Sequence, residues 1–454
     1  MKNNLKTFSR KRKLANLLAL LLLPVGHVFA YDSGSTGTDG VFNPLVDTEL
    51  VLPADGVFNY TTVSIPAGVT VTFKRNQMNT PVIWLATGDV TIDGKVILSG
   101  TSSADIGAAG DGAVGDDGLP GLAGPGGFDG GVGGGANSQL GSAGYGPGRG
   151  LPATGSGTYI STTYGCGGSG AGFALVGKNS GSQSTSSNRL CYVSKDGAIG
   201  GTDYGNIDIL PLIGGSGGGG ASGGFTTSGS GGGGGGGAIL IGSSATVTVN
   251  GELKADGGNS GAVNSASGGG SGGGGAGGGI RIIATTISGN GIISANAGQA
   301  GMVTIPDYPY ESYSKGGNGS DGRIRLEAEN FLRTTGTTPS YLLASPGDLF
   351  VAGLPAVRIT SEAAVDAPAI PTGDADIVLP ITTSNPVTVN LASNGVPTGN
   401  TVKLTMVPAT GNPVSVISSA LTGTIDSATA TVTIDLPEGP SVLQAEVSYS
   451  VTSN

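Results

Sequence analysis

Three aspartates are the residues of this sequence whose type and setting come closest to a chemical site. Asp116 and Asp117 are adjacent within a glycine-rich run, and Asp321 ends the stretch Gly316-Gly-Asn-Gly-Ser-Asp321, which resembles the start of a calcium-binding nonapeptide repeat. Their carboxylates could bind calcium, and the adjacent pair could serve as acid and base in polysaccharide cleavage. The nonapeptide, however, needs stacked copies and an apolar residue where this sequence has Arg323. We therefore interpret the three as solvated turn residues and predict no metal, no cofactor and no catalytic residue.

The first 30 residues have the three parts of a secretory signal peptide. A basic region precedes an apolar run from Leu14 to Leu23, and Val28-Phe29-Ala30 forms a cleavage site. The apolar run is shorter than the roughly 20 residues that a membrane-spanning helix needs, so a transmembrane anchor is the weaker interpretation. We expect the chain to be exported through this cleavable peptide, with no membrane insertion after its removal.

The composition of the remaining chain excludes several classes of function. The only histidine, His27, lies in the predicted signal peptide, so the exported chain could form no Ser-His-Asp triad and no histidine-ligated metal site. Without the six basic residues of that peptide, 15 lysines and arginines face 31 aspartates and glutamates, a net charge of −16. Nucleic acids and anionic membranes both need a basic surface. We predict neither as a partner.

Tyrosines gather in and beside the glycine-rich segments, and three of them, Tyr308, Tyr310 and Tyr313, lie close together. Tyrosine on a rigid scaffold is a good contact residue for sugars and proteins. These three are the candidate binding residues, for a glycan or another cell. The alternative is that they cap the edges of the glycine segments.

Two cysteines, Cys166 and Cys191, remain in a chain that is expected to enter an oxidising compartment. We predict a disulfide between them, the alternative being two isolated buried thiols. By the chain-entropy estimate such a bond stabilises the fold by about 3 kcal/mol.

A repeat organises the middle of the chain. Apolar strands begin at Gly237, Gly279 and Gly322, at spacings of 42 and then 43 residues. Their residues alternate, so that Ile280 is predicted to point inward and Arg281 outward. Each unit is too small to bury its apolar face alone.

The corners between these strands are predicted at Asp93-Gly94, Asn250-Gly251 and Asn290-Gly291, because such residues adopt positive φ most easily. Repeated short strands with turns predict an all-β fold, a parallel β-helix or solenoid with glycine-rich insertions. The alternative is an ordinary β-sandwich with glycine-rich insertions.

Glycine supplies 89 of 454 residues, and its runs lie between the strand groups. From Gly112 to Gly135 it occupies every third position. A polyproline-II helix has about three residues per turn, so a glycine at every third position gives it a row without side chains, against which another backbone can bond. We interpret this run as one strand of a polyglycine-II sheet, in preference to a collagen-like triple helix or a flexible spacer. Gly112, Gly115 and Gly118 then begin its contact row.

These motifs also carry a resemblance. The segment VSIPAGVTVTFKRNQMNTPVIWLATGDVTIDGKVILSG, followed by GPGGFDGG and by GGGGAGGGIRI, resembles a group of secreted glycine-rich proteins of Gram-negative bacteria, over about Asp55 to Leu326. The resemblance implies export and a β-helical body, and it transfers no catalytic residue. The glycine blocks are similar in kind to polyglycine-II domains in the tail-fibre adhesins of some bacteriophages.

The composition changes near Val351, where the glycine runs stop. Seven short apolar stretches separated by turns predict an immunoglobulin-like β-sandwich, one of its strands being Asp376–Thr382. The predicted organisation is thus a signal peptide (1–30), an N-terminal linker (31–48), a glycine-rich β-helical domain (49–350) and a sandwich domain (351–454).

Three functions from different classes fit this organisation. The first is a structural component of the bacterial cell surface or extracellular matrix, for which self-assembly is expected. The second is an adhesin that binds glycans or other cells through Tyr308, Tyr310 and Tyr313. The third and most remote is a carboxylate-dependent polysaccharide lyase or hydrolase. We expect the first, with the cell surface or the medium as location and the periplasm as an open alternative.

Overall fold

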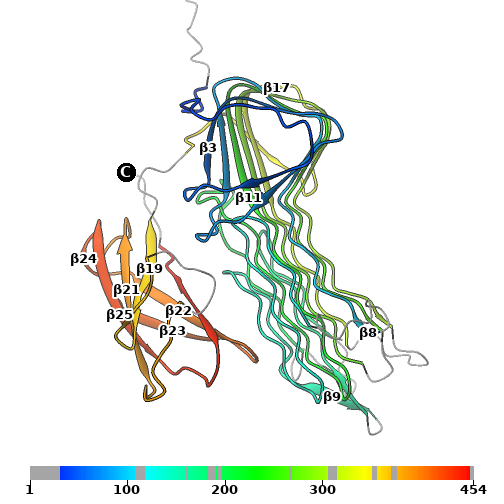
Figure 1. The fold of residues 1–454 in the computed structure, drawn as a ribbon, viewed down its shortest axis with the longest axis vertical. Helices are drawn as coiled ribbons and strands as arrows, with labels where there is room; N and C mark the ends of the chain where they lie inside the picture. The colour runs from blue at the N-terminus through cyan, green and yellow to red at the C-terminus, as the bar shows by residue number, and fades with distance from the viewer. Residues whose placement is uncertain are drawn as a thin grey trace, which may run out of the picture.

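The computed structural model describes residues 31–107, 118–159, 162–181, 191, 197–264, 268–304, 314–349, 355–369 and 376–449. Across these residues the chain is all-β, without helices, and most of its strand pairs are parallel. Figure 1 shows a group of parallel strands from which long glycine-rich segments extend, and a separate group of strands formed by the C-terminal residues.

The largest sheet, here called sheet A, contains strands from the whole parallel region, and all its pairs are parallel. Its order is β1-β3-β5-β11-β14-β17-β18, with β6 pairing both β3 and β11. The strands are β1 (Gly40–Phe42), β3 (Val57–Ile65), β5 (Val82–Ala86), β6 (Val90–Ile92), β11 (Ala238–Val249), β14 (Gly279–Ser288), β17 (Arg323–Phe331) and β18 (Leu342–Ala344).

Two further sheets are also parallel, and their strands are stacked in the same chain order as those of sheet A. Sheet B has the order β15-β12-β7-β4-β2, and sheet C has the order β16-β13-β8. Their strands are β2 (Thr48–Val51), β4 (Thr70–Lys74), β7 (Lys95–Ile97), β8 (Ile106–Gly107), β12 (Glu252–Lys254), β13 (Val263–Asn264), β15 (Ile292–Ser294) and β16 (Val303–Thr304). A short antiparallel hairpin, β9 (Ser156–Tyr159) and β10 (Thr162–Gly165), lies outside these sheets.

Equivalent strands of the repeat pair with each other, but not in the register that their first glycines predict. Ala238 pairs with Gly279, and Gly279 with Arg323, so the structural steps at the strand starts are 41 and 44 residues rather than 42 and 43. This register places Ile280 opposite Ile324, both facing the core. A slip of one residue would turn the apolar face outward, so the apolar alternation sets the register.

Apolar side chains from sheets A and B form the core of the parallel region. The chain's single tryptophan, Trp84, is fully buried there and packs against the rings of Tyr60 and Phe73. Because Val and Ile dominate the inward positions, each strand contributes stiff, β-branched side chains that suit a pleated surface. Fluorescence of Trp84 therefore reports on this core alone.

The corner glycines differ from the prediction. Gly94, Gly251 and Gly291 do not have positive φ. Instead they stack closely: a Cβ on Gly251 would overlap the carbonyl oxygen of Gly94, and a Cβ on Gly291 would overlap that of Gly251. Glycine is needed here for close approach of backbones rather than for a left-handed conformation.

Residues 31–48, predicted to be a linker, belong to the parallel region. They include β1 of sheet A, and the buried Ser33 donates a hydrogen bond to the carbonyl oxygen of Ala86 at 2.7 Å. The N-terminal part of the described chain is therefore tied to the strands beside it.

The C-terminal residues form two antiparallel sheets around their own apolar core. One has the order β20-β19-β21-β25-β24 and the other β23-β22-β26. Their strands are β19 (Ala356–Glu362), β20 (Val365–Asp366), β21 (Val387–Asn394), β22 (Thr401–Pro408), β23 (Val414–Ala420), β24 (Thr422–Thr424), β25 (Ser427–Ile434) and β26 (Ser441–Glu446). The stretch 376–382, predicted as a strand, is not one. It contains Pro380, which has no N–H to donate to a ladder.

Candidate functional site

The predicted binding tyrosines Tyr308, Tyr310 and Tyr313 lie outside the described residues, and so do the calcium candidates Asp116 and Asp117. The predicted signal peptide also lies outside them.

The third calcium candidate, Asp321, lies within the described residues and forms a hydrogen bond with the backbone. Its carboxylate accepts a hydrogen bond from the N–H of Ala297 at 2.8 Å. Within the described ranges, no three His, Cys, Asp or Glu side chains lie together as a metal site would need.

The feature that distinguishes this chain is a set of glycine-rich segments that lie side by side and are joined by backbone hydrogen bonds (Figure 1). We call it the glycine lattice. It comprises residues 98–105, 118–135, 139–155, 165–181, 197–204, 214–237, 255–262, 268–278, 295–302 and 314–322. Nearly all residues of its interior segments 214–223, 229–237 and 268–278 are buried.

Hydrogen bonds in the lattice repeat every three residues. In residues 273–278 of segment 268–278, one N–H donates to segment 214–223, the next to 314–322 and the third to 255–262, after which the order repeats. The pairs, at 2.7 to 3.0 Å, are Gly273 with Gly219, Gly274 with Gly317, Gly275 with Gly258, Ala276 with Ser216, Gly277 with Ser320 and Gly278 with Ala255. A backbone that bonds in this way presents an equivalent group to the same neighbour at every third position.

Side-chain-free positions are required on several sides of an interior segment. Three successive glycines of segment 229–237 each approach a different neighbour so closely that an added Cβ would overlap a carbonyl oxygen there. The overlaps are Gly232 with Gly218, Gly233 with Gly258, and Gly234 with Leu122. Long runs of consecutive glycine are thus explained by packing on all sides.

The triplet run, of which residues 118–135 are described, contains two antiparallel segments rather than the single strand predicted. Gly130 donates to the carbonyl oxygen of Gly121 at 3.0 Å. The chain reverses at Pro125-Gly126, where Gly126 has a φ of 75°. Proline followed by a glycine of positive φ is typical of a tight turn, so this dipeptide is the signal for the reversal.

Buried serines, which no sequence pattern above predicted, also join segments of the lattice. Their hydroxyls accept hydrogen bonds from lattice N–H groups, replacing a carbonyl oxygen as acceptor. The pairs are Cys166 with Ser222 and Gly272 with Ser230, both at 2.8 Å, and Gly261 with Ser103 at 2.7 Å. The available signal was a single serine within or beside an otherwise apolar glycine run.

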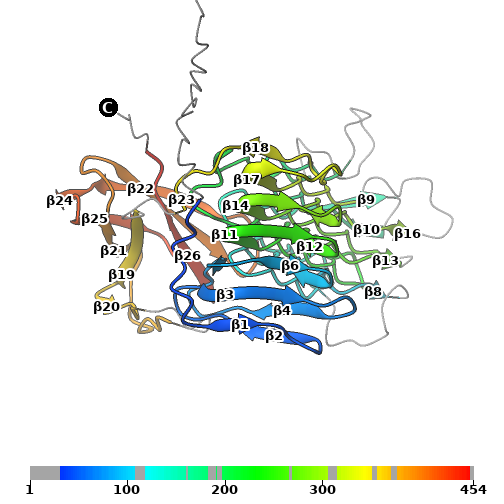
Figure 2. The same ribbon diagram turned by 90° about the horizontal axis from the view of Figure 1, so that it is seen from above.

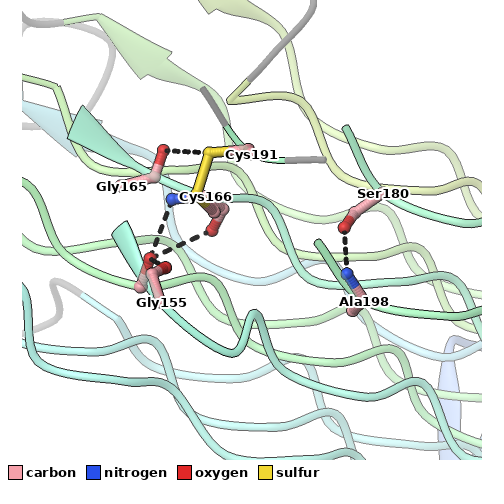
Figure 3. Close-up of a disulfide and its surroundings, with 7 residues drawn as sticks. Gly155, Gly165, Cys166, Ser180, Cys191 and Ala198 are labelled. Atoms are coloured by element: carbon pink, nitrogen blue, oxygen red, sulfur yellow. Dashed lines mark hydrogen bonds between the residues drawn. A yellow bond between two sulfur atoms is a disulfide. The ribbon is translucent and has the colours of Figure 1, made fainter. Parts of the chain in front are cut away.

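Cys166 and Cys191 form the predicted disulfide, with Cα atoms 5.4 Å apart. Both cysteines are buried. Figure 3 shows the bond beside the backbone of Gly155, whose carbonyl oxygen accepts a hydrogen bond at 2.8 Å from the hydroxyl of Ser222. The disulfide therefore joins Cys191 to the edge of the lattice.

Replacing both cysteines with serine is expected to lower the free energy of unfolding by about 3 kcal/mol, because the crosslink restricts the unfolded chain. Amide hydrogen exchange, read by mass spectrometry, should show faster exchange in residues 165–181. Reduction of the unaltered chain serves as the control and should give the same change. Exchange that is equally slow in reduced and oxidised protein would contradict a stabilising role.

An ion pair is buried on the outer face of sheet A. Arg281 points away from the core, as predicted, yet is only 3 % exposed. Its Nε donates to the carboxylate of Glu327 at 2.7 Å, and its Nη2 donates to the carbonyl oxygen of Asp348 at 2.9 Å. Burial raises the pKa of the Glu327 carboxyl, but hydrogen bonds from Arg281 and Arg325 outweigh that effect and leave the pKa below its ordinary value.

Two further arginines of β17 connect sheet A to the glycine-rich segments. Arg325 bonds both Glu327 at 2.7 Å and Asp208 at 3.1 Å. Arg323 donates to the carbonyl oxygens of Phe173 and Tyr204, and its guanidinium carbon lies 4.8 Å from the centre of the Phe173 ring. The Arg323 contacts join lattice segments 165–181 and 197–204 to sheet A.

A cavity of about 310 Å³ lies between the outer face of sheet A and residues 209–212. Its walls are almost entirely apolar, although Asp55 and Arg281 also line it. The Arg281 guanidinium is already bonded to Glu327 and to the backbone. The cavity thus offers a small apolar space without a converging set of polar groups.

The described part of the chain contains no helix that is long and apolar enough to cross a bilayer. Its fold and site define an all-β protein with mostly parallel sheets and a backbone-bonded glycine lattice. Comparison with protein-family models, with curated proteins and with solved structures finds no match to this chain.

Proposed function

We propose that this chain is an exported, non-catalytic structural protein of the cell surface or extracellular matrix of a Gram-negative bacterium. In this proposal, sheets A, B and C are the faces of a β-helix, the glycine lattice is a polyglycine-II array, and the C-terminal sheets are an immunoglobulin-like sandwich.

The observation that carries the proposal is the three-residue period of hydrogen bonds in the interior of the lattice. A body built in this way derives most of its order from the backbone, and inward side chains such as Ser222 and Ser230 are engaged in hydrogen bonds that hold its segments together. It does have a fixed shape. Shape and rigidity are the properties that a surface or matrix component supplies.

Several carboxylates of the described chain support the same interpretation, because they hold backbone or ion-pair contacts. Asp129 pairs with Arg75 at 2.8 Å. Asp256 accepts a hydrogen bond from the N–H of Asn296 at 2.6 Å. The disulfide is compatible with an oxidising compartment outside the cytoplasm.

Fractionation of cells that make the chain tests this location. We expect the chain in the surface or extracellular fraction, at a mass that lacks residues 1–30, and we expect antibody to label it on intact cells. A cytoplasmic enzyme in the same cells is the control for leakage. Uncleaved chain confined to the cytoplasm would overturn the proposal.

A further inference from the structure

The stack of parallel sheets ends in open strand edges. Among the described strands, β1 pairs only with β3 and β2 only with β4, while at the opposite end β18 pairs only with β17. An edge strand presents unpaired backbone donors and acceptors. Proteins made of stacked units normally protect such ends with a polar capping unit.

Both end units instead carry exposed apolar side chains. At the first end these side chains are 67 to 81 % exposed, and at the last end they are 44 to 66 % exposed. The first set is Val41, Leu45, Val46 and Val51, and the second is Leu332, Leu342 and Leu343. End units built to face water would carry polar residues at these positions.

The C-terminal sheets leave both ends uncovered. Figure 2 shows β1 and β2 at one end of the stack and β18 at the other, with the C-terminal strands beside the stack. Neither end is therefore closed by the chain's own second group of sheets.

The two ends match each other. β1 and β18 have three residues each, and both belong to sheet A, in which every neighbouring pair is parallel. In sheet B, β2 forms the first edge, and Thr338 makes a parallel bridge to Ser294 near the last edge. A second copy of this chain presents an edge of sheet A and an edge of sheet B together. A single strand from another protein would satisfy only one of them.

We infer that copies of this chain associate head to tail, the β1 and β2 end of one copy adding in parallel to the β18 end of the next. The biological meaning of this inference rests on the proposed structural function. Because the two contact surfaces differ, the association does not close by twofold symmetry and extends into a filament.

Two variants block one end each. Leu45→Lys with Val46→Lys alters the first end, and Leu342→Lys with Leu343→Lys alters the last end. The full chain, purified after export, is expected to form filaments in negative stain and species in sedimentation whose mass rises with concentration. Each variant alone should remain a monomer. An equimolar mixture of the two should form dimers and nothing larger, since each variant keeps one complementary end.

A matched control replaces two exposed leucines of the lattice, Leu119→Lys with Leu122→Lys, which are 50 and 53 % exposed and belong to none of the end strands β1, β2 and β18. This variant should assemble as the unaltered chain does. Fluorescence of the buried Trp84 checks that every variant is folded. If a double variant does not fold, the two single lysine substitutions at the same positions are tested instead.

An unaltered chain that stays monomeric at all concentrations would overturn the inference. So would dimerisation of the last-end variant by itself, which would indicate a twofold contact through β1. A monomeric chain at the cell surface would overturn this inference but not the proposed function. A cytoplasmic chain that still forms filaments would overturn the proposed function but not this inference.

Discussion

Replacing Gly274 with valine is expected to lower the free energy of unfolding of the glycine lattice by at least about 4 kcal/mol. A Cβ at this position would overlap the carbonyl group of Gly298. Because that group is backbone, it cannot relieve the overlap by a change of side-chain rotamer. Overpacking an ordinary core costs about 1–3 kcal/mol, and each backbone hydrogen bond that the displaced segments lose adds about 1 kcal/mol. Gly274 itself donates to Gly317 at 2.9 Å and accepts from Ala171 at 3.0 Å.

Amide hydrogen exchange across residues 268–278 and 295–302 measures this effect, with thermal unfolding as a second readout. Gly336→Val is the matched control. Gly336 has open space around the position of its Cβ and no positive φ, so its substitution should change stability by less than about 0.5 kcal/mol. Equal exchange in the two variants would show that close backbone packing does not hold the lattice.

Replacing Glu327 with alanine is expected to lower the free energy of unfolding of the parallel region by about 4 kcal/mol, because it leaves the guanidinium of Arg281 buried without its anion. Glu327 is fully buried and accepts hydrogen bonds from Arg281, from Arg325 and from the N–H of Gly347 at 2.8 Å. Denaturant unfolding followed by the fluorescence of Trp84 measures the loss.

Two comparisons isolate the buried charge as the cause. Glu252→Ala removes a carboxylate that also contacts two cations, Lys95 and Lys254, but at the surface, and should cost less than about 1 kcal/mol. Arg281→Leu combined with Glu327→Leu removes the most deeply buried pair, leaves Arg325 paired with Asp208, and should recover most of the stability that Glu327→Ala loses. A double variant as unstable as the single one would contradict this account.

The same carboxylate gives stability a pH dependence. The pKa of Glu327 lies below its ordinary value of 4.5 in the folded chain. Its contribution is therefore complete above the unfolded pKa and is lost as the pH falls through the folded pKa. We expect Glu327→Gln to reduce the acid dependence of unfolding between neutral pH and the acid range. An unchanged slope would show that other carboxylates determine it.

The sequence predicted the parallel region well because strand alternation and local turns are encoded by nearby residues. It predicted the all-β class, the pairing of repeated strands and the disulfide between Cys166 and Cys191. It predicted the wrong step between units, since the glycines at 237, 279 and 322 are conspicuous but do not fix which face of a strand is buried.

Arg281 shows where local pattern is insufficient. Alternation places it correctly on the outer face of sheet A, yet residues 345–349 cover that face. Covering segments come from distant parts of the chain, so no pattern within β14 indicates them. The corner glycines were placed correctly, but their close backbone packing and the hydrogen bonds of the buried serines were not predicted, because their neighbours belong to other units.

The three-residue period of the lattice also restricts how such a chain can change length. Inserting three residues into one interior segment returns every later N–H to the neighbour it had before, whereas inserting one or two directs each N–H toward a different neighbour. The position of an inserted side chain is also restricted, because only on an outer side of the lattice can it avoid overlap with a neighbouring backbone. Descendants of this sequence that keep the lattice should therefore gain or lose residues there in threes, and should do so together in segments that share hydrogen bonds.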